Sequence, residues 1–262
     1  LNNTLNEIPE KFNFLYVGHW LQGKLGEDRK DTGMLVKTFL ETFKNKPNPP
    51  ALIMKTSGAT FSIMDRDDIL GKINHIRNRV SSSGDTLPNI YLLHGELSKE
   101  EMNKMYNHPK CKAMVSFSHG EGFGRPLLEF SLSGKPVITS GWGGQTDFLD
   151  KNLSVLLPGE LKQVGQSAVW KDVILPESSW FTVNYKYASR VLEEVYKNYD
   201  KFKVNSKKQA KINKTKFSLD RMYEELDNIL LKYLPEFSQE VQLKLPKLKK
   251  IGSSSTNDKI KL

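Results

Sequence analysis

The chain has 262 residues and a formal net charge of +9, from 39 Lys and Arg against 30 Asp and Glu. Its hydrophobic content of 38% and aromatic content of 10% suffice for a folded core, which excludes a wholly disordered chain. The single cysteine, Cys111, excludes an intrachain disulfide and a multi-cysteine zinc site and favours a reducing compartment, and no apolar run is long enough to span a membrane.

Short apolar runs typical of β-strands alternate with segments of helical spacing along most of the chain. In chain order we predict a strand at 12–18, a helix at 32–45, a strand at 51–55, a helix with its apolar stripe at 69–80, a strand at 89–95, a helix that begins at the capping box of Ser98 and Glu101, strands at 112–117, 135–140 and 153–158, and helices at 183–199 and 218–233. This alternation predicts an α/β fold, a doubly wound Rossmann-like parallel sheet with flanking helices, followed by C-terminal helices.

Composition divides the chain into four parts. We expect a linker or N-terminal extension at 1–11, a Rossmann-like domain at 12–200, a C-terminal helical segment at 201–235 and a basic flexible tail at 236–262. Residues 197–262 hold 16 Lys and Arg against 8 Asp and Glu, whereas the first 196 residues hold 23 against 22. The lysines of the C-terminal end lack the aromatic side chains and motifs of a nucleic-acid site, so we expect no nucleic-acid partner.

The predicted strand at 112–117 runs into a glycine-rich turn. Gly120, Gly122 and Gly124 occupy alternate positions, and Pro126 is placed for the first turn of a helix. Ligands of open α/β sheets bind beyond the carboxyl ends of the strands. A turn of this kind presents free backbone N–H groups and the positive end of a helix dipole, which favours an anion such as a phosphate.

Two carboxylates, Glu121 and Glu129, bracket this turn eight residues apart. Carboxylates are poor phosphate ligands but good acceptors for sugar hydroxyls. The pattern therefore indicates a ligand with both phosphate and hydroxyl groups. The alternative is that Glu129 complements the helix N-terminus while Glu121 is a solvated loop residue.

The segment EGFGRPLLE at 121–129 resembles the E-x7-E motif of retaining glycosyltransferases of the GT-B fold, in the family 4 (group 1) class. Four other segments resemble the same family in the same order: YVGHW (16–20), DRKDTGMLVKTF (28–39), YLLHGELSKEEMNKMY (91–106) and GKPVITSGWGGQTDFL (134–149). The resemblance implies that the chain is the C-terminal half of a GT-B fold, with a nucleotide-sugar-binding domain at 12–200. It also implies an N-terminal acceptor-binding domain, on the parent chain or on a partner.

The resemblance assigns roles to the glycine-rich turn. Glu121 would hold hydroxyls of the donor sugar, and Glu129 would accept hydrogen bonds from the ribose. The backbone N–H groups of Phe123 and Gly124 would face the diphosphate or the sugar, with Gly122 beside them in the binding turn.

Positive groups would stabilise the nucleoside-diphosphate leaving group, in place of the metal ion that other transferases use. Lys30, with Arg29 beside it, would neutralise the diphosphate. The position after Gly18 is commonly Arg in this family and is His19 here, so less positive charge is available unless Lys24 compensates.

The base would contact the main chain at 93–97, which includes Gly95 and Leu97. Arg125 stands where the family more often has an apolar residue; it is either a phosphate contact or, as we prefer, a surface residue. Five further residues have two interpretations, ligand contact or a role within the protein itself: Lys55, Thr56, Ser57, His119 and Trp142.

The sequence predicts a retaining glycosyltransferase of hexosyltransferase type that moves a sugar from a UDP-, GDP- or similar nucleoside-diphosphate sugar to a hydroxyl acceptor, with no cofactor and no metal ion. The alternative is a non-catalytic nucleotide- or sugar-binding module of a larger assembly. An NAD-dependent dehydrogenase is disfavoured because the glycine-rich turn follows the fourth predicted strand instead of the first.

The first residues contain neither an initiator Met nor the apolar core of a signal peptide. We therefore expect a chain that begins inside a longer protein and a cytoplasmic location. Membrane association is expected only through the missing acceptor-binding half, without which the chain is expected to bind donor but not to transfer it efficiently.

Overall fold

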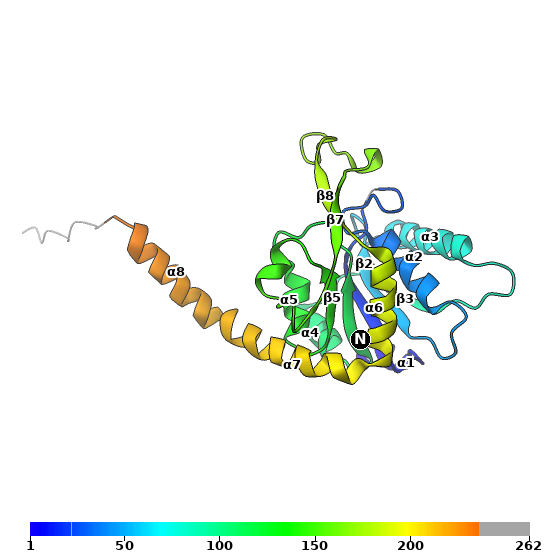
Figure 1. The fold of residues 1–262 in the computed structure, drawn as a ribbon, viewed down its shortest axis with the longest axis horizontal. Helices are drawn as coiled ribbons and strands as arrows, with labels where there is room; N and C mark the ends of the chain where they lie inside the picture. The colour runs from blue at the N-terminus through cyan, green and yellow to red at the C-terminus, as the bar shows by residue number, and fades with distance from the viewer. Residues whose placement is uncertain (22, 236–262) are drawn as a thin grey trace, which may run out of the picture. The chain divides into compact units, whose positions relative to one another are not determined.

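The computed structural model describes residues 1–21 and 23–235, which belong to two compact units, Leu1–Arg221 and the described part of Met222–Leu262. The first unit is built on a six-stranded parallel sheet (Figure 1). Each strand overlaps the one predicted for it, and the six are β1 (Asn13–His19), β2 (Ala51–Ser57), β3 (Ile90–Leu93), β4 (Cys111–Ser116), β5 (Val137–Ser140) and β6 (Val155–Leu157).

The strands lie side by side in the order β3-β2-β1-β4-β5-β6. The chain moves outward from β1 to β3, returns to the centre, and moves outward in the other direction from β4 to β6. The direction therefore reverses between β1 and β4, and open α/β sheets form a ligand-binding crevice at such a point. This order confirms the predicted doubly wound, Rossmann-like sheet.

Helices cover both faces of the sheet. The α-helices of the described residues are α1 (Asn2–Glu7), α2 (Thr32–Phe43), α3 (Ile63–Val80), α4 (Lys99–Asn107), α5 (Arg125–Ser131), α6 (Tyr185–Lys197), α7 (Tyr199–Lys216) and α8 (Leu219–Tyr233), with short 3-10 helices at Gly144–Asp147 and Gln166–Ala168. Side chains alternate along each strand, so each face has its own core. Phe14 and Tyr16 pack with α2, α3 and α6, whereas Leu15 packs with α1, α4 and α5 on the opposite face.

Two helix starts follow from capping side chains. The predicted capping box of α4 is present: Ser98 Oγ accepts a hydrogen bond from the backbone of Glu101, and the Glu101 carboxylate accepts one from the backbone of Ser98. Helix α3 begins after Ser62, whose Oγ accepts from the backbone N–H of Asp65 at 3.1 Å. These bonds satisfy N–H groups that have no partner inside a helix.

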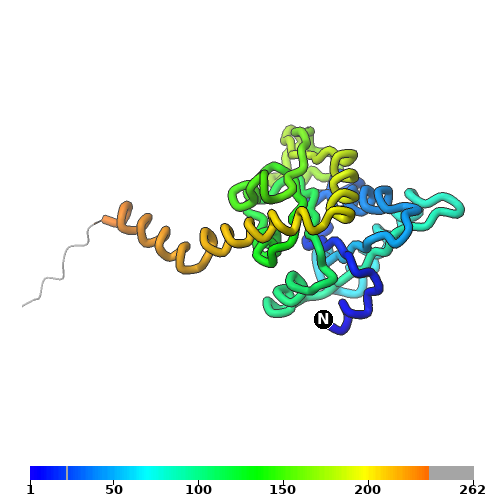
Figure 2. The backbone as a smooth tube through the Cα atoms, turned by 60° about the horizontal axis from the view of Figure 1, so that its bottom comes forward, coloured from blue at the N-terminus to red at the C-terminus, as the bar shows by residue number. Residues whose placement is uncertain are grey.

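The N-terminal segment 1–11, expected to be a linker or an N-terminal extension, is part of the compact body. Leu5 on α1 is fully buried and Ile8 is 6% exposed, both in the core beneath α4 and α5. Lys110 Nζ also donates to the carbonyl of Asn6 at 2.8 Å. Figure 2 traces the backbone of this segment in dark blue from the N-terminus. A helix of six residues is too short to show a periodic apolar pattern.

The compact unit extends past residue 200, to Arg221, and so includes the first part of the helical segment expected at 201–235. Helix α7 packs on it through polar side chains: Gln209 Nε2 donates to the carbonyl of Phe148 at 2.7 Å, and Asn213 Nδ2 donates to Ser131 Oγ at 2.8 Å. Polar contacts of this kind leave no apolar stripe in the sequence.

An antiparallel hairpin of β7 (Gly159–Gln163) and β8 (Ser179–Val183) follows β6 as a second sheet (Figure 1). All five residues of β7 are exposed, so no buried face marks that strand in the sequence. Strand β8 buries Phe181 and Val183 in the core that contains α2 and α6. The hairpin was not predicted.

Helix α8 confirms the helix predicted at 218–233. The tail predicted at 236–262 lies outside the described residues. None of the helices in the described part of the chain combines the length and the apolar content of a membrane span.

Candidate functional site

The glycine-rich turn links β4 to α5. Gly124, the N-cap of α5, has a φ of 85°, in the left-handed region that favours glycine, and Pro126 follows in the first helical turn. Gly144 packs so closely on the turn that a Cβ there would lie 2.1 Å from the Gly122 carbonyl oxygen. A Cβ at Gly120 or Gly122, in contrast, would meet no described atom within 4 Å. The packing of the protein does not require glycine at these two positions, and space for a ligand remains above them.

Lys30 and Glu121 form an ion pair beside this turn. Their side chains are largely buried, with 13% and 12% of their surface exposed. Burial lowers the pKa of Lys30, and the neighbouring charge of Glu121 opposes that shift. Arg29 Nη1 donates to the carbonyl of Gly120 at 3.1 Å, which is a second link between the two loops. The structure thus brings into contact the two residues predicted as catalytic.

A cleft of about 800 Å³ opens at the carboxyl ends of β1 and β2, beside α4 and α5. The predicted site residues that line it are Gly18, His19, Arg29, Lys30, Leu97 and Glu129. Lys55, Thr56 and Ser57 line it as well, in agreement with the ligand-contact interpretation. Glu121, Gly122, Phe123, Gly124 and Gly95 are not among its described lining residues. Glu121 lies next to the cleft, in contact with Lys30, which lines it.

The described lining of the cleft carries more positive than negative charge. Its cations are Arg29, Lys30, Lys55, Lys99, Arg125 and Lys214, and its carboxylates are Glu96 and Glu129. A cleft lined by one sign of charge concentrates ions of the opposite sign. The cleft therefore suits an anionic ligand. Within residues 1–21 and 23–235, no group of three or more His, Cys, Asp or Glu could hold a metal ion.

Glu129 projects from α5, with 41% of its side chain exposed. Arg125, one turn earlier, lies with its Nε 3.4 Å from the Glu129 carboxylate and is 81% exposed. The phenol of Tyr106 is buried beside them, and its pKa is raised by burial first and then by the charge of Glu129. Arg125 is thus a surface residue at the rim of the cleft.

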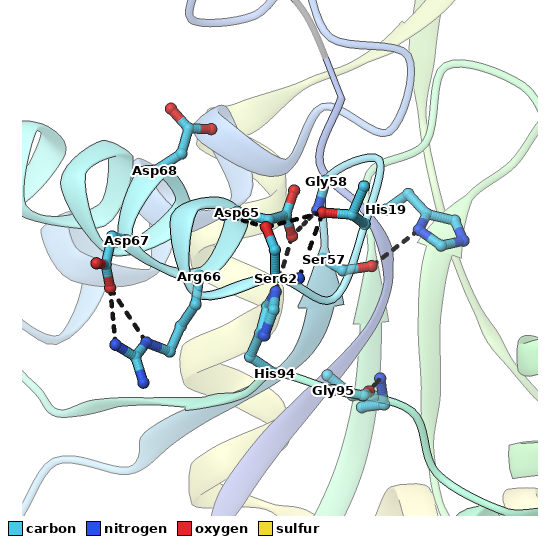
Figure 3. Close-up of polar contacts among 12 residues, drawn as sticks. His19, Ser57, Gly58, Ser62, Asp65, Arg66, Asp67, Asp68, His94 and Gly95 are labelled. Atoms are coloured by element: carbon cyan, nitrogen blue, oxygen red, sulfur yellow. Dashed lines mark hydrogen bonds and ion pairs between the residues drawn. The ribbon is translucent and has the colours of Figure 1, made fainter.

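Gly18 and His19 end β1 beside the cleft. A Cβ at Gly18 would lie 2.6 Å from the hydroxyl of Tyr16, which is hydrogen-bonded to Thr32 Oγ1 at 2.7 Å. Glycine is therefore needed at position 18 to accommodate that buried phenol. His19 Nδ1 lies 3.2 Å from Ser57 Oγ, which ties the end of β1 to the end of β2 (Figure 3).

The segment predicted to contact a base is held by two cross-links. Gly95 has a φ of 114°, again in the left-handed region, and its carbonyl accepts a hydrogen bond from Lys55 Nζ at 2.6 Å. His94 Nε2 lies 2.7 Å from Asp65 Oδ2, which also accepts from the backbone N–H of Gly58 (Figure 3). These bonds fix the main chain at the far end of the cleft.

Solved glycosyltransferase structures share the fold of this chain. The chain is similar to HepE from Anabaena, solved in complex with UDP and glucose, with a TM-score of 0.60 and 13% identity over 88% of this chain and 51% of that one. It is similar to the C-terminal domain of LpcC, a glycosyl transferase group 1 family protein from Francisella tularensis, with a TM-score of 0.56 and 15% identity over 83% of this chain and 92% of that domain. It is also similar to sucrose-phosphate synthase from Thermosynechococcus elongatus, with a TM-score of 0.59 and 16% identity over 88% of this chain and 47% of that one. The chain has the fold of a GT-B C-terminal domain.

The chain spans about half the length of HepE and of sucrose-phosphate synthase, and nearly all of the LpcC C-terminal domain. No protein-family model and no curated protein sequence matches it. Identities this low establish the fold alone. The comparisons therefore confirm the resemblance to GT-B glycosyltransferases at the level of the fold.

Two buried carboxyl groups next to the cleft, those of Asp28 and Asp31, were not predicted. Asp28 accepts a hydrogen bond from the backbone of Thr32 at 2.9 Å, and Asp31 accepts one from the Tyr185 hydroxyl at 2.6 Å. Burial raises the pKa of both carboxyl groups, that of Asp31 to about 8. The two acids flank two basic residues in the sequence DRKD, a pattern that is equally typical of a charged surface loop.

Aromatic side chains near the glycine-rich turn pack against other aromatic side chains of the protein. Trp142 stacks on Phe181 with 5.9 Å between ring centroids, and the ring of Phe123 lies 5.2 Å from that of Phe148. His119 is 1% exposed and stacks on Trp180. For Trp142 and His119, the interpretation as parts of the protein's own packing agrees with the structure.

Proposed function

We propose that this chain is the donor-binding half of a retaining glycosyltransferase of family 4 and hexosyltransferase type. A nucleoside-diphosphate sugar binds in the cleft at the carboxyl ends of β1 and β2, and the sugar passes to a hydroxyl acceptor. The contact between Lys30 and Glu121 carries the proposal, because it places a cation for phosphate next to a carboxylate for sugar hydroxyls.

Lys30 and Arg29 bind the diphosphate. Negative charge develops on the leaving nucleoside diphosphate as the glycosidic bond breaks, and fixed cations in a partly buried site stabilise it. Glu121 orients the ammonium of Lys30, and the bond to Gly120 orients Arg29. Lys55 adds positive charge in the same cleft, so it offsets the His at position 19 better than Lys24, which is not among the described lining residues.

Glu121 accepts hydrogen bonds from hydroxyls of the donor sugar. The open space above Gly120 and Gly122 admits the sugar ring next to this carboxylate. The backbone N–H groups of Phe123 and Gly124 face the sugar or the diphosphate. In this arrangement the protein contributes orientation and charge, without a cofactor or metal ion.

Glu129 accepts hydrogen bonds from the ribose, and the main chain at Gly95 and Leu97 contacts the base. Glu129 and Leu97 both line the cleft, whose volume of about 800 Å³ lies within the range usual for small-molecule sites. The cross-link from Lys55 holds the Gly95 carbonyl in place for this contact.

The structural neighbours suggest the first ligands to try. HepE was solved with UDP and glucose and with UDP-glucose, so uridine diphosphates are suitable probes. Because the chain spans about half of HepE, we place the acceptor-binding domain on the parent chain or on a partner, in the cytoplasm. The second candidate is a non-catalytic nucleotide- or sugar-binding module of a larger assembly.

A thermal-shift screen of UDP-, GDP-, ADP- and TDP-sugars tests the proposal, because a ligand of the folded state raises Tm. At least one donor is expected to raise Tm. Lys30→Gln, which removes the charge but can still donate to Glu121, is expected to weaken donor binding about 10- to 100-fold. Lys37→Gln is the matched control, since Lys37 forms an exposed pair with Glu41 on α2.

The proposal fails if no donor raises Tm, or if the Lys30 and Lys37 variants bind donor equally well. Donor binding without turnover, also when the acceptor-binding domain is supplied, would favour the non-catalytic module.

A further inference from the structure

A second hollow lies beside the cleft, between α7 and the turn that follows α5, and its volume is about 380 Å³. We call it the α7 hollow; its lining includes three residues of α7 and three of the turn, which are Lys207, Lys211, Lys214, Leu132, Ser133 and Gly134. Leu132, Ser133 and Lys214 also line the cleft described above, so the two spaces adjoin each other. No residue to which a donor contact is assigned is among the described lining residues of the α7 hollow.

The lysines of the α7 hollow start from fixed backbone positions. Their spacing of four and three residues places them on one face of the helix. Asn213, which is fully buried on the neighbouring face, anchors α7 by donating to Ser131 Oγ at 2.8 Å. A Cβ at Gly134 would lie 3.4 Å from Lys207 Cγ, so the turn packs directly against the stem of that lysine. The three ammonium groups are therefore held around one space.

These ammonium groups have no acidic partner in the part of the chain that the structure describes. No carboxylate is among the described lining residues, and none of the three lysines forms an ion pair or a side-chain hydrogen bond there. Other lysines nearby do form such contacts. Lys201 Nζ lies 3.9 Å from a carboxylate oxygen of Glu194, and Lys135 Nζ donates to the Tyr106 carbonyl at 2.8 Å.

A bound anion would relieve the repulsion inside the α7 hollow. Like charges one turn apart on a helix destabilise it, and a space lined by positive charge concentrates anions. Lysine binds phosphate as a point charge, and a phosphate ester carries a charge of about −1.5 to −2 near pH 7. Leu132 and Ala210 add apolar surface for an uncharged part of the ligand. The volume lies within the range of about 300–1,000 Å³ that is usual for small-molecule sites.

We propose that the α7 hollow is a second anion site, in which Lys207, Lys211 and Lys214 bind a phosphate group of a ligand other than the sugar donor. This site does not rest on the proposed function, because none of its contacts involves the donor. The phosphate belongs either to a soluble phosphorylated compound or to a lipid headgroup, which present the same anionic oxygens to the lysines.

Nitrogen-15 NMR of the whole chain during titration with inorganic phosphate tests the site directly. The backbone amide signals of Gly134 and Ala210 are expected to shift and to saturate in the wild type. The hollow variant combines Lys207→Gln, Lys211→Gln and Lys214→Gln. It is expected to bind phosphate at these signals about 10- to 100-fold more weakly, because three partly screened charge contacts are lost.

The control variant removes the same charge from the same helix, outside the α7 hollow. It combines Lys201→Gln, Lys208→Gln and Lys216→Gln, all at exposed positions that are not among the described lining residues. Gln has nearly the helix propensity of Lys, so both variants are expected to fold. The control variant is expected to bind phosphate nearly as the wild type does.

Lys30→Gln separates the α7 hollow from the cleft. The shifts of Gly134 and Ala210 are expected to persist in this variant, whatever happens to donor binding. Their loss in Lys30→Gln would place the phosphate in the cleft and overturn the proposal. Equal weakening in the hollow and control variants would overturn it too, as would shifts that never saturate, which would indicate an adventitious ion only.

Flotation with vesicles of phosphatidylglycerol and phosphatidylcholine identifies the source of the phosphate. Binding that is lost in the hollow variant but kept in the control variant, and that is absent with pure phosphatidylcholine, would assign the phosphate to a lipid headgroup. No vesicle binding, together with the saturable NMR titration, would assign it to a soluble compound. If neither measurement depends on the three lysines, the proposal is wrong, and the proposed function is untouched.

Discussion

At the scale of single residues, the charged groups near the glycine-rich turn lie at two depths below the protein surface. Lys30 and Glu121 meet at the cleft, while Asp28 and Asp31 lie beneath it with their pKa values raised by burial. Lys30 and Glu121 could be predicted as site residues because they lie in segments that resemble family motifs. The burial of Asp28 and Asp31 could not be predicted, because the sequence DRKD does not indicate which of its charged side chains face inward.

Asp31→Asn is expected to remove a loss of stability that the wild type shows as pH rises from about 4 to about 8. The folded-state pKa of Asp31, about 8, lies above its ordinary value, so the folded state keeps a proton that the unfolded state has lost. That contribution is fully present below the ordinary pKa of 3.8, declines as pH rises above it, and is gone once pH has passed the folded-state pKa of about 8. Asn also tolerates the φ of 49° at this position.

Urea denaturation at about pH 7 and about pH 8 measures this effect. The wild type is expected to lose roughly 1 kcal/mol relative to Asp31→Asn over that interval. Parallel stability curves for the two proteins would show that Asp31 ionises near its ordinary pKa.

Gly124→Ala is expected to destabilise the fold by roughly 1–2 kcal/mol, because an alanine Cβ is strained at a φ of 85°. Gly71→Ala is the matched control: Gly71 lies within α3 and an added Cβ would meet no described atom within 4 Å. That control is expected to gain about 0.5–1 kcal/mol from helix propensity. Thermal unfolding of both variants checks the pair, and equal effects would contradict the strain at Gly124.

At the scale of elements, the sequence predicted those whose apolar pattern is regular. All six strands of the main sheet, the start of α4 and the helix over 218–233 were confirmed. Helix α1 is too short for a pattern, β7 is exposed throughout, and α7 packs through amides. The cleft also could not be predicted, since its walls come from segments up to 197 residues apart, from Val17 to Lys214, whose distances depend on the fold.

Leu5→Ala tests whether α1 belongs to the body. Leu5 is fully buried against α4 and α5, so its truncation is expected to cost about 2–5 kcal/mol of unfolding free energy. Leu70→Ala on α3, where the side chain is 39% exposed, is expected to cost much less. Urea denaturation of both variants provides the comparison. If Leu5→Ala loses no more unfolding free energy than Leu70→Ala, the segment 1–11 is not part of the compact body.

At the scale of the whole molecule, the net charge of +9 does not describe the site. The excess lies mainly in residues 197–262, whereas most cations of the cleft come from the nearly neutral first 196 residues. What matters for a ligand is the local surplus beside the Lys30–Glu121 pair. The fold is that of a GT-B C-terminal domain, and its cleft lies at the strand-order reversal where such sheets bind ligands.

The central claim is that the cleft binds a nucleotide by its diphosphate. Isothermal titration of the wild-type chain with UDP and with uridine at one salt concentration tests it directly. We predict that UDP binds at least about 100-fold more tightly than uridine, a difference of about 2.7 kcal/mol supplied by the cations of the cleft. Equal affinities for UDP and uridine, or no binding of UDP, would contradict the account.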